Sequence, residues 1–159
     1  MFNHAPSNYK CPICLGVTGI ENEDTLLKKG DLVYKDESTS VFINSFFIGK
    51  NEGHLMVVPN SHYEHIFDVP PTILHNIMDT AKKMAGIMKK VYECEGITLL
   101  QNNEPAGGQH AFHFHLHVFP RYTDDKIYDH MTNKRLATPE ERKKYADKIM
   151  EYLSSIKPL

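Results

Sequence analysis

The chain has 159 residues, a formal net charge of −2 and 24% charged residues. This length predicts one domain with a buried core, and 41% hydrophobic residues are typical of a soluble globular protein. The small negative charge excludes an overall basic field, so we expect neither nucleic acid nor a membrane as a partner, and a bound phosphate would need local donors.

The chain carries no sign of export. Residues 2–10 are mostly polar, which excludes a signal peptide and predicts a loose arm at residues 1–10, and no apolar run is long enough to cross a membrane. Three cysteines are too few for a disulfide framework. We therefore expect a cytoplasmic protein in which Cys94 is a packing residue.

The first half of the chain predicts turns followed by strands. Glycines punctuate residues 11–30, which predicts a turn-rich segment. Residues 31–35 and 39–44 are rich in Val, Phe, Ile and Tyr and predict two strands joined by a hairpin. A third strand at 54–58 is expected to end at Pro59, which cannot donate a hydrogen bond to a ladder.

A long helix is the clearest element of the middle of the chain. Apolar residues recur at spacings of three and four from Pro70 to Glu93, which predicts one apolar stripe. We expect Asp68 to cap the start of this helix and Gly96 to end it. A buried strand at 97–101 and a polar loop at 102–109 follow.

The last third predicts a strand, a loop and a helix. Residues 111–119 form the strand, whereas residues 121–137 lack periodicity and predict a loop. A second helix begins at Thr138, which forms a capping box with Glu141. Several antiparallel strands with two helices are typical of an α+β fold, here with about five strands, a long central helix and a C-terminal helix.

The strand at 111–119 carries a histidine at every second position. His113, His115 and His117 therefore share one face, with roughly 6.5–7 Å between neighbours. The core-facing positions between them are Phe112, Phe114, Leu116 and Val118. Three interpretations arise: a solvated strand face, a metal site built from imidazoles, or one nucleophilic imidazole whose neighbours bind anionic oxygens.

The loop before this strand favours the nucleophile. Gly107-Gly108-Gln109 allows the backbone to approach an anion closely and to offer N–H groups to it. Gln109 and Asn102 add neutral side-chain donors. Such a loop suits phosphate in a chain that has no basic patch.

These features resemble the histidine triad (HIT) superfamily, whose signature is three histidines alternating with apolar residues behind an Asn and a Gly-Gln. The matching residues are Asn102, Gly108-Gln109 and His113-Phe-His115-Leu-His117-Val-Phe-Pro120-Arg121. Gly53-His54-Leu-Met-Val-Val-Pro59 with His62, and Cys11-Pro-Ile-Cys14, resemble further landmarks of its zinc-containing branch. The resemblance covers residues 11–122 of a single domain, 1–159, and leaves 123–159 as a C-terminal extension.

The resemblance implies a HIT-like fold, a homodimer and a hydrolase or transferase that acts on a purine nucleotide. It implies that His115 attacks the α-phosphate of a nucleoside phosphoramidate or dinucleoside polyphosphate to form a nucleotidyl-histidine intermediate, from which water or phosphate then releases the nucleotide. Asn44 is implied to bind the ribose, and His54 to lie near the nucleophile. The implied phosphate-binding set is Asn102, Gly108, Gln109, His110 and His117.

His110 departs from the family pattern. Close relatives carry Ser or Thr at this position, where the hydroxyl helps to bind phosphate or to protonate the leaving group. His110 is either a general acid or a surface histidine beside the site. The leaving group is therefore open, although Phe46-Phe47-Ile48 and a longer stretch before Gly53 favour dinucleoside polyphosphates.

Cys11 and Cys14 have the spacing of zinc ligands, although such a pair also fits a redox site or two buried thiols. The resemblance supplies His62 and His113 as the remaining ligands of a structural zinc ion. Zinc bound there would steady the strand that carries the nucleophile. His65 and His75 are expected at the surface.

Two alternatives to the nucleotide hydrolase remain. One is a non-catalytic, nucleotide-binding regulatory module on the same fold. The other is a metalloenzyme that uses the histidine row itself as its metal site.

Overall fold

The computed structural model describes residues 3–156, so the first two residues of the expected arm and residues 157–159 lie outside it. At its centre lies an antiparallel five-stranded sheet with the order β1-β2-β4-β6-β5. The predicted α+β fold is therefore confirmed. The strands are β1 (Leu32–Lys35), β2 (Thr39–Ile43), β4 (Leu55–Pro59), β6 (Leu116–Arg121) and β5 (Gly96–Gln101).

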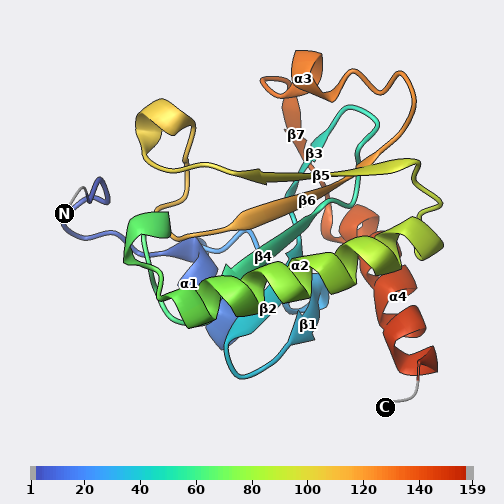
Figure 1. Ribbon diagram of the computed structural model, residues 1–159. Helices are drawn as coiled ribbons and strands as arrows, with labels where there is room; N and C mark the ends of the chain where they lie inside the picture. Colours follow the sequence, from blue (N-terminus) through green and yellow to red (C-terminus); the bar gives the residue numbers. More distant parts are fainter. Residues whose placement is uncertain (1–2, 157–159) are drawn as a thin grey trace.

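Helices and a small second sheet surround this centre (Figure 1). The α-helices are α1 (Pro12–Thr18), α2 (Pro71–Val91), α3 (Ile127–His130) and α4 (Pro139–Ser155). The 3-10 helices are η1 (Lys29–Asp31), η2 (Ile66–Asp68) and η3 (Pro105–Gly107). The second sheet pairs β3 (Phe46–Ile48) with β7 (Lys134–Leu136).

The central sheet buries both of its faces because apolar residues continue through adjacent positions of its strands. In β2, Val41 and Ile43 join the main core under α2 and α4, whereas Phe42 joins a second core against α1. Alternation along β6 sends Leu116 and Val118 to the main core, so His117 and Phe119 occupy the opposite face. The functional side of the sheet is thus the one away from α2.

The long helix forms as predicted, but both of its expected boundary residues have other roles. Pro70 is the N-cap, and Asp68 lies in η2 with its carboxylate 3.3 Å from His65 Nδ1. The helix ends at Val91, and Gly96 is the first residue of β5. The proline fixes the backbone entry to the helix without a side-chain cap, which periodicity alone does not reveal.

The strand at 97–101 is half-buried rather than buried. Strand β5 is half-buried along its length, and Leu99 is 42% exposed. The reason is its place at the edge of the sheet, where it pairs with β6 alone. The run of apolar residues in this strand is the pattern of a buried strand, which is why the sequence predicted burial.

Residues 11–30 contain a helix that the glycine pattern did not indicate. Pro12 lies in the first turn of α1, the Cys11 sulfur accepts a hydrogen bond from the Cys14 N–H, and Gly19 ends the helix with a φ of 73°. Two turns of helix are too short to reveal a 3.6-residue period.

The segment 121–137, expected as a loop, contains α3 and β7 instead. Ile127 is buried against Ile48 and Phe119, and β7 pairs with β3 (Figure 1, top). Three-residue strands carry too little alternation to be detected in a sequence. The capping box of Thr138 and Glu141 at the start of α4 forms as predicted.

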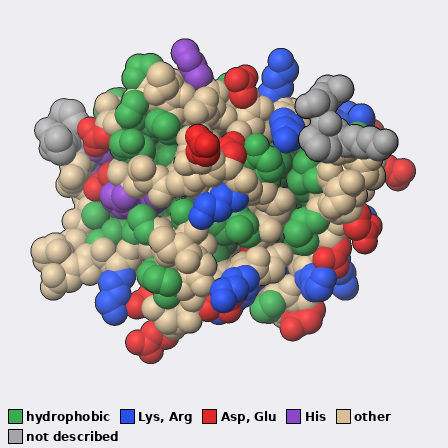
Figure 2. Space-filling view, turned by 90° about the horizontal axis from the view of Figure 1, so that it is seen from below, with side chains coloured by type: hydrophobic (Ala, Val, Ile, Leu, Met, Phe, Trp, Pro, Cys, Tyr) green, Lys and Arg blue, Asp and Glu red, His purple; other side chains and the backbone are tan. Residues whose placement is uncertain are grey.

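In the part of the chain that the structure describes, no helix is both long and apolar enough to cross a membrane. On the face drawn in Figure 2, acidic and basic side chains are interspersed among apolar ones. This face carries no broad patch of a single charge, in agreement with the small net charge.

Candidate functional site

A pocket of about 360 Å³ lies on the side of the sheet away from α2. Its size suits a small-molecule ligand. The lining brings together most of the residues predicted for the site, although they lie far apart in the sequence. The predicted residues that line it are Asn44, His54, Asn102, Gly108, His110, His115 and His117.

The histidine row is only partly a strand. Strand β6 begins at Leu116, so His117 lies in the ladder opposite Met56, whereas His113 and His115 precede the strand. Phe112 is also displaced from the core face, because it packs edge-to-face on Tyr9. Backbone irregularity before β6 therefore replaces the regular strand that strict alternation predicts.

The departure from strand geometry fixes the protonation of His115. Its Nδ1 lies 2.7 Å from the carbonyl oxygen of His113. Because a carbonyl only accepts, Nδ1 carries the proton and Nε2 keeps a lone pair. The ring is 6% exposed and lines the pocket. This arrangement is that of a neutral imidazole held in one tautomer.

Burial keeps the neighbouring imidazoles neutral as well. Desolvation lowers the pKa of His115, with a smaller contribution from His110, and lowers the pKa of His117 still further. It lowers the pKa of His54 to about 3. The rings are close: His115 and His117 have centroids 4.9 Å apart, and His54 stacks on Phe119 at 4.2 Å.

Gln109 does not line the pocket, which corrects the expectation that its side chain meets phosphate. Its amide oxygen accepts from the Glu104 N–H, and its Nε2 donates to the carbonyl oxygens of Glu64 and Ala111. The side chain is 3% exposed. Gln109 therefore shapes the loop that carries Gly108, which has a φ of 85°.

His110 is exposed and lines the pocket, so both of its predicted roles stay open. His65, by contrast, is 1% exposed, which corrects its expected surface position. It begins η2 and packs against Phe67. Sequence periodicity could not place it, since it lies in an irregular segment before α2. His75 is exposed as predicted, and Cys94 is buried in the main core.

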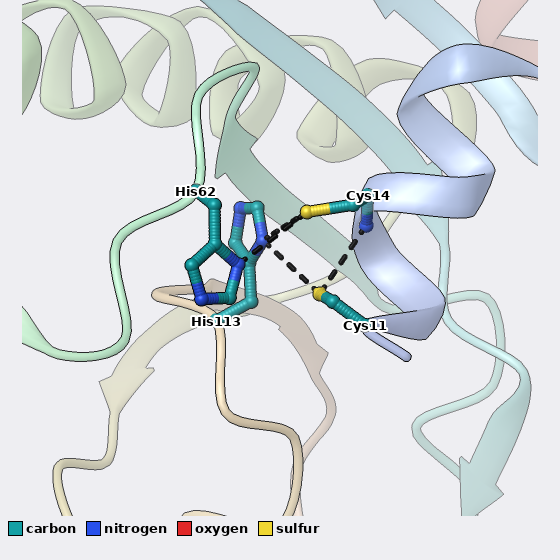
Figure 3. A group of neighbouring side chains, drawn as sticks. All are labelled: Cys11, Cys14, His62 and His113. Carbon is teal, nitrogen blue, oxygen red and sulfur yellow. Dashed lines mark hydrogen bonds between the residues drawn. The ribbon is translucent and has the colours of Figure 1, made fainter. Parts of the chain in front are cut away.

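A second cluster lies beside the histidine row. The ligand atoms of Cys11, Cys14, His62 and His113 all lie within 4.8 Å of one another (Figure 3). Helix α1 supplies both sulfurs, and each histidine Nδ1 is 3.4 Å from the Cys14 sulfur. These four residues were the predicted metal ligands.

The cluster fits a tetrahedral ion. Zinc bonds of about 2.0–2.3 Å require ligand atoms roughly 3.3–3.8 Å apart, and the three sulfur–nitrogen distances of 3.4 Å agree with this separation. The other nitrogen of His113, Nε2, lies 3.1 Å from the Pro59 carbonyl oxygen, so Nδ1 is free for a metal. Burial and Cys11 raise the pKa of the Cys14 thiol to about 12.

His113 joins the two clusters. Its ring belongs to the Cys/His cluster, while its carbonyl oxygen accepts the Nδ1–H of His115. Whatever fixes the His113 side chain also fixes that carbonyl. The geometry therefore couples a metal-type site to the orientation of the His115 ring.

Sequence reasoning missed the pocket wall supplied by the C-terminal extension. Met131, Thr132 and Lys134 line the pocket, and Ser45 does so from the turn before β3. No motif or period in residues 121–137 marks these residues, because their placement depends on the pairing of β7 with β3.

A family model described as the HIT domain matches residues 27–124, more than half of the chain. The chain belongs to the histidine triad family. An uncharacterized HIT-like protein of Methanocaldococcus jannaschii is 35% identical over 59% of this chain and 70% of its own length. Adenylylsulfatase HINT3 of Arabidopsis thaliana is 28% identical over 49% of this chain and 40% of its own length.

Solved structures of the histidine triad family share the fold. A zinc-bound family member from Mycobacterium smegmatis has a TM-score of 0.73 and 23% identity over 91% of this chain and 94% of its own. Diadenosine triphosphate hydrolase of Plasmodium falciparum has a TM-score of 0.70 and 18% identity over 96% of this chain and 88% of its own. The proteins similar to this chain thus include one named an adenylylsulfatase, and the fold is shared with a diadenosine triphosphate hydrolase.

Proposed function

We propose that this protein is a nucleotide hydrolase or transferase in which His115 attacks the α-phosphate of a nucleoside phosphoramidate or dinucleoside polyphosphate. The observation that carries the proposal is the 2.7 Å contact of His115 Nδ1 with the His113 carbonyl. This contact leaves Nε2 unprotonated in a pocket that is also lined by all of the other predicted ligand-binding residues except Gln109. Two proteins similar to this chain, an adenylylsulfatase and a diadenosine triphosphate hydrolase, have names that belong to the same reaction class.

The proposed reaction proceeds in two displacements. The Nε2 lone pair forms a bond to the α-phosphorus while the bond from phosphorus to the leaving group breaks, which gives a nucleotidyl-histidine. Water or phosphate then attacks the phosphorus and restores neutral His115. During both steps the positive charge on the imidazolium ring is stabilised by the His113 carbonyl at Nδ1.

Neighbouring residues supply binding. His117 and the Gly108 loop lie where they can meet the phosphate oxygens, with Asn102 beside them. The side-chain oxygen of Asn44 accepts the Phe46 N–H, and its Nδ2 makes a long contact of 3.9 Å with the Met56 sulfur, so its second amide N–H is left for a ribose hydroxyl. The purine would lie against the apolar part of the pocket wall. Gln109 contributes by holding the loop rather than by contact.

We propose a structural zinc ion at Cys11, Cys14, His62 and His113. When bound, zinc supplies a closed four-ligand crosslink between α1, the segment after β4 and the start of the histidine row. Support comes from the separations of the ligand atoms and from the Pro59 carbonyl that orients His113. No group of three or more possible metal ligands among the described residues contains His115 or His117, which disfavours a catalytic metal on the row.

We further propose a homodimer and a single domain over residues 1–159. The exposed edge strand β5, with Leu99 at its surface, supports pairing with the same strand of a second copy. The C-terminal extension is anchored to the remainder by a buried contact of Arg142 with Asp31. We also propose a cytoplasmic location, which the free thiols of all three cysteines support.

The test is a panel of adenosine phosphoramidate, diadenosine triphosphate and adenylyl sulfate, each with and without added phosphate, on the wild type and His115→Asn. From adenosine phosphoramidate and adenylyl sulfate we expect the wild type to release AMP with water and ADP with phosphate as the acceptor. From diadenosine triphosphate, whose leaving group is ADP, we expect AMP plus ADP with water and two ADP with phosphate. His115→Asn should lose at least about 10³-fold in kcat. Intact mass spectrometry of quenched wild-type reactions should detect a nucleotidyl adduct.

His75→Asn is the matched control, because His75 is exposed on α2 and lies outside the pocket. It should retain wild-type activity. Full turnover by His115→Asn would overturn the nucleophile. Nucleotide binding without turnover of any member of the panel would instead support the regulatory module.

A further inference from the structure

The α3–β7 segment, residues 127–136, closes one wall of the pocket with residues beyond the HIT domain match at 27–124. Its position is fixed by the register of β7 on β3, in which Ile48 pairs with Lys134 and Phe46 with Leu136. Because side chains alternate along a strand, Lys134 and Arg135 point to opposite sides of this small sheet.

These two neighbouring cations differ in their partners. Arg135 forms ion pairs with Glu52 at 2.7 Å and with Glu141 at 3.0 Å, so its charge is compensated. Lys134 has no carboxylate partner among the residues that the structure describes; its ammonium lies 5.2 Å from the centre of the Phe46 ring. Phe46 lines the pocket as well.

Lys134 is also the one Lys or Arg among the described residues that line the pocket. Its charge reaches the catalytic row, since it contributes to lowering the pKa of the buried His117. Neutral imidazoles and an apolar pocket wall do not compensate the charge of the Lys134 ammonium. An anionic ligand would compensate that charge and would be bound more tightly for it.

We propose that Lys134 is a specificity-determining residue that binds the oxyanion of the leaving group and so selects nucleotides joined to a phosphate chain or a sulfate over phosphoramidates. This inference rests on the proposed attack of His115 at the α-phosphate. Lys134 contacts the part of the substrate beyond that phosphate. The C-terminal extension thereby supplies substrate preference to a site whose reacting groups lie in the HIT domain.

The two leaving groups make different demands in the first displacement. When a phosphate chain leaves, the bond from the α-phosphorus to the bridging oxygen breaks, and its electron pair becomes a new terminal oxyanion. A fixed ammonium stabilises that charge as it develops. When an amine leaves, the nitrogen must take up a proton to depart as a neutral group, and an additional cation gives no such benefit.

The experiment compares wild type, Lys134→Met and Lys134→Arg. Methionine keeps the apolar contact with Phe46, and arginine keeps the charge. We expect Lys134→Met to lose roughly tenfold in kcat/KM with diadenosine triphosphate and adenylyl sulfate but less than about threefold with adenosine phosphoramidate, and Lys134→Arg to retain most activity with all three. Loss with only one of the two anionic leaving groups identifies the one that Lys134 recognises.

Lys50→Met is the matched control, because Lys50 is exposed in the turn after β3 and does not line the pocket. It removes the same charge from the same small region and should leave the substrate ratios unchanged. Equal losses with anionic and amine leaving groups in Lys134→Met, or no loss at all, would overturn the role of Lys134 while the function of His115 stands.

A binding measurement separates this inference from the proposed function. Calorimetric titration with ADP and AMP should show that Lys134→Met weakens ADP roughly tenfold while AMP changes less than about twofold. An unchanged ratio of the two dissociation constants refutes the contact. If the ratio changes but no panel substrate is turned over, the contact with the distal phosphate stands and the catalytic proposal fails.

Discussion

The sharpest constraint on a single residue lies at Glu104, in the loop that carries Gly108. Its φ of 61° and ψ of 158° fall in a region that is almost restricted to glycine. The loop enforces this conformation, because the Glu104 N–H donates to Gln109 and its carbonyl accepts from Gly107 and Gln109. Backbone strain at Glu104 is therefore built into the loop that carries Gly108, a residue that lines the pocket.

Glu104→Gly should raise the free energy of unfolding by about 1 kcal/mol, because removal of the Cβ strain outweighs the extra backbone entropy of glycine in the unfolded chain. For a chain of this length the melting temperature should rise by roughly 2–4 °C. Calorimetry would measure the shift. Glu104→Ala is the control: it removes the same carboxylate but keeps the Cβ, and a comparable gain from it would rule out backbone strain as the cause.

The burial of His54 should make the free energy of unfolding depend on pH. Burial lowers its pKa from the ordinary 6.5 to about 3, so between these pH values the unfolded chain binds a proton that the folded chain excludes. The contribution of His54 to the free energy of unfolding is therefore complete above pH 6.5. It falls by about 1.4 kcal/mol per pH unit as the pH decreases from 6.5 toward 3.

Urea unfolding of wild type and His54→Gln at several pH values from 7.5 to 4 would isolate this contribution. Below pH 6.5 the free energy of unfolding of the variant should fall less steeply than that of the wild type. The difference in slope should correspond to about one proton taken up on unfolding. His75→Gln, at an exposed position of α2, controls for a change in total histidine content. Parallel curves for wild type and His54→Gln would contradict the burial argument.

At the level of elements, the Cys/His cluster fixes α1 against the histidine row. If it binds zinc, Cys14→Ser should lose the metal and lower the melting temperature by at least about 10 °C, because binding free energy of a structural ion is folding free energy. Activity should fall as well, since the His113 carbonyl orients His115. Metal analysis and calorimetry measure both effects.

Cys94→Ala serves as the thiol control for that experiment, because Cys94 is buried in the main core and is absent from the cluster. It should keep about one zinc per chain while losing some packing energy. A metal content unaffected by Cys14→Ser would exclude the cluster as the zinc site.

Elements with a clear period or a local chemical signature could be predicted from the sequence. The stripe of α2, the capping box of α4 and the hairpin of β1 and β2 belong to this group, because neighbouring residues alone define them. The seven-residue α1 and the pair of β3 and β7 could not be predicted, since short elements depend on distant partners.

The same division applies to the candidate site. Apart from Gln109, the predicted residues line the pocket or belong to the Cys/His cluster, because the HIT signature specifies them by spacing. Their roles stay predictions, and His113 and His115 precede the strand on which they were expected. Gln109 faces backbone groups instead of the pocket, and Lys134 enters from a segment without a motif. Which side chain faces a ligand depends on backbone irregularities that alternation does not encode.

For the whole molecule, a buried ion pair joins the C-terminal helix to the beginning of the sheet. Arg142 Nε lies 2.8 Å from Asp31 Oδ1, and both side chains are almost completely buried. Arg142 also donates to the carbonyl oxygens of Ala137, next to β7, and of Leu26, which lines the pocket. One side chain therefore ties α4, the end of the α3–β7 segment and a pocket wall together.

Arg142→Leu should lower the free energy of unfolding by about 3–5 kcal/mol, because it leaves the buried Asp31 carboxylate without its cationic partner and with the Lys28 N–H, at 2.7 Å, as its remaining donor among the described residues. The double variant Asp31→Leu with Arg142→Leu should be less destabilised than Arg142→Leu alone, since both buried charges are then removed. Lys143→Ala provides the surface comparison on the next residue of α4: its exposed pair with Asp147 should contribute less than about 1 kcal/mol. A double variant less stable than the single one would contradict this argument and show that the hydrogen bond from the Lys28 N–H to Asp31 outweighs the cost of burying the lone carboxylate.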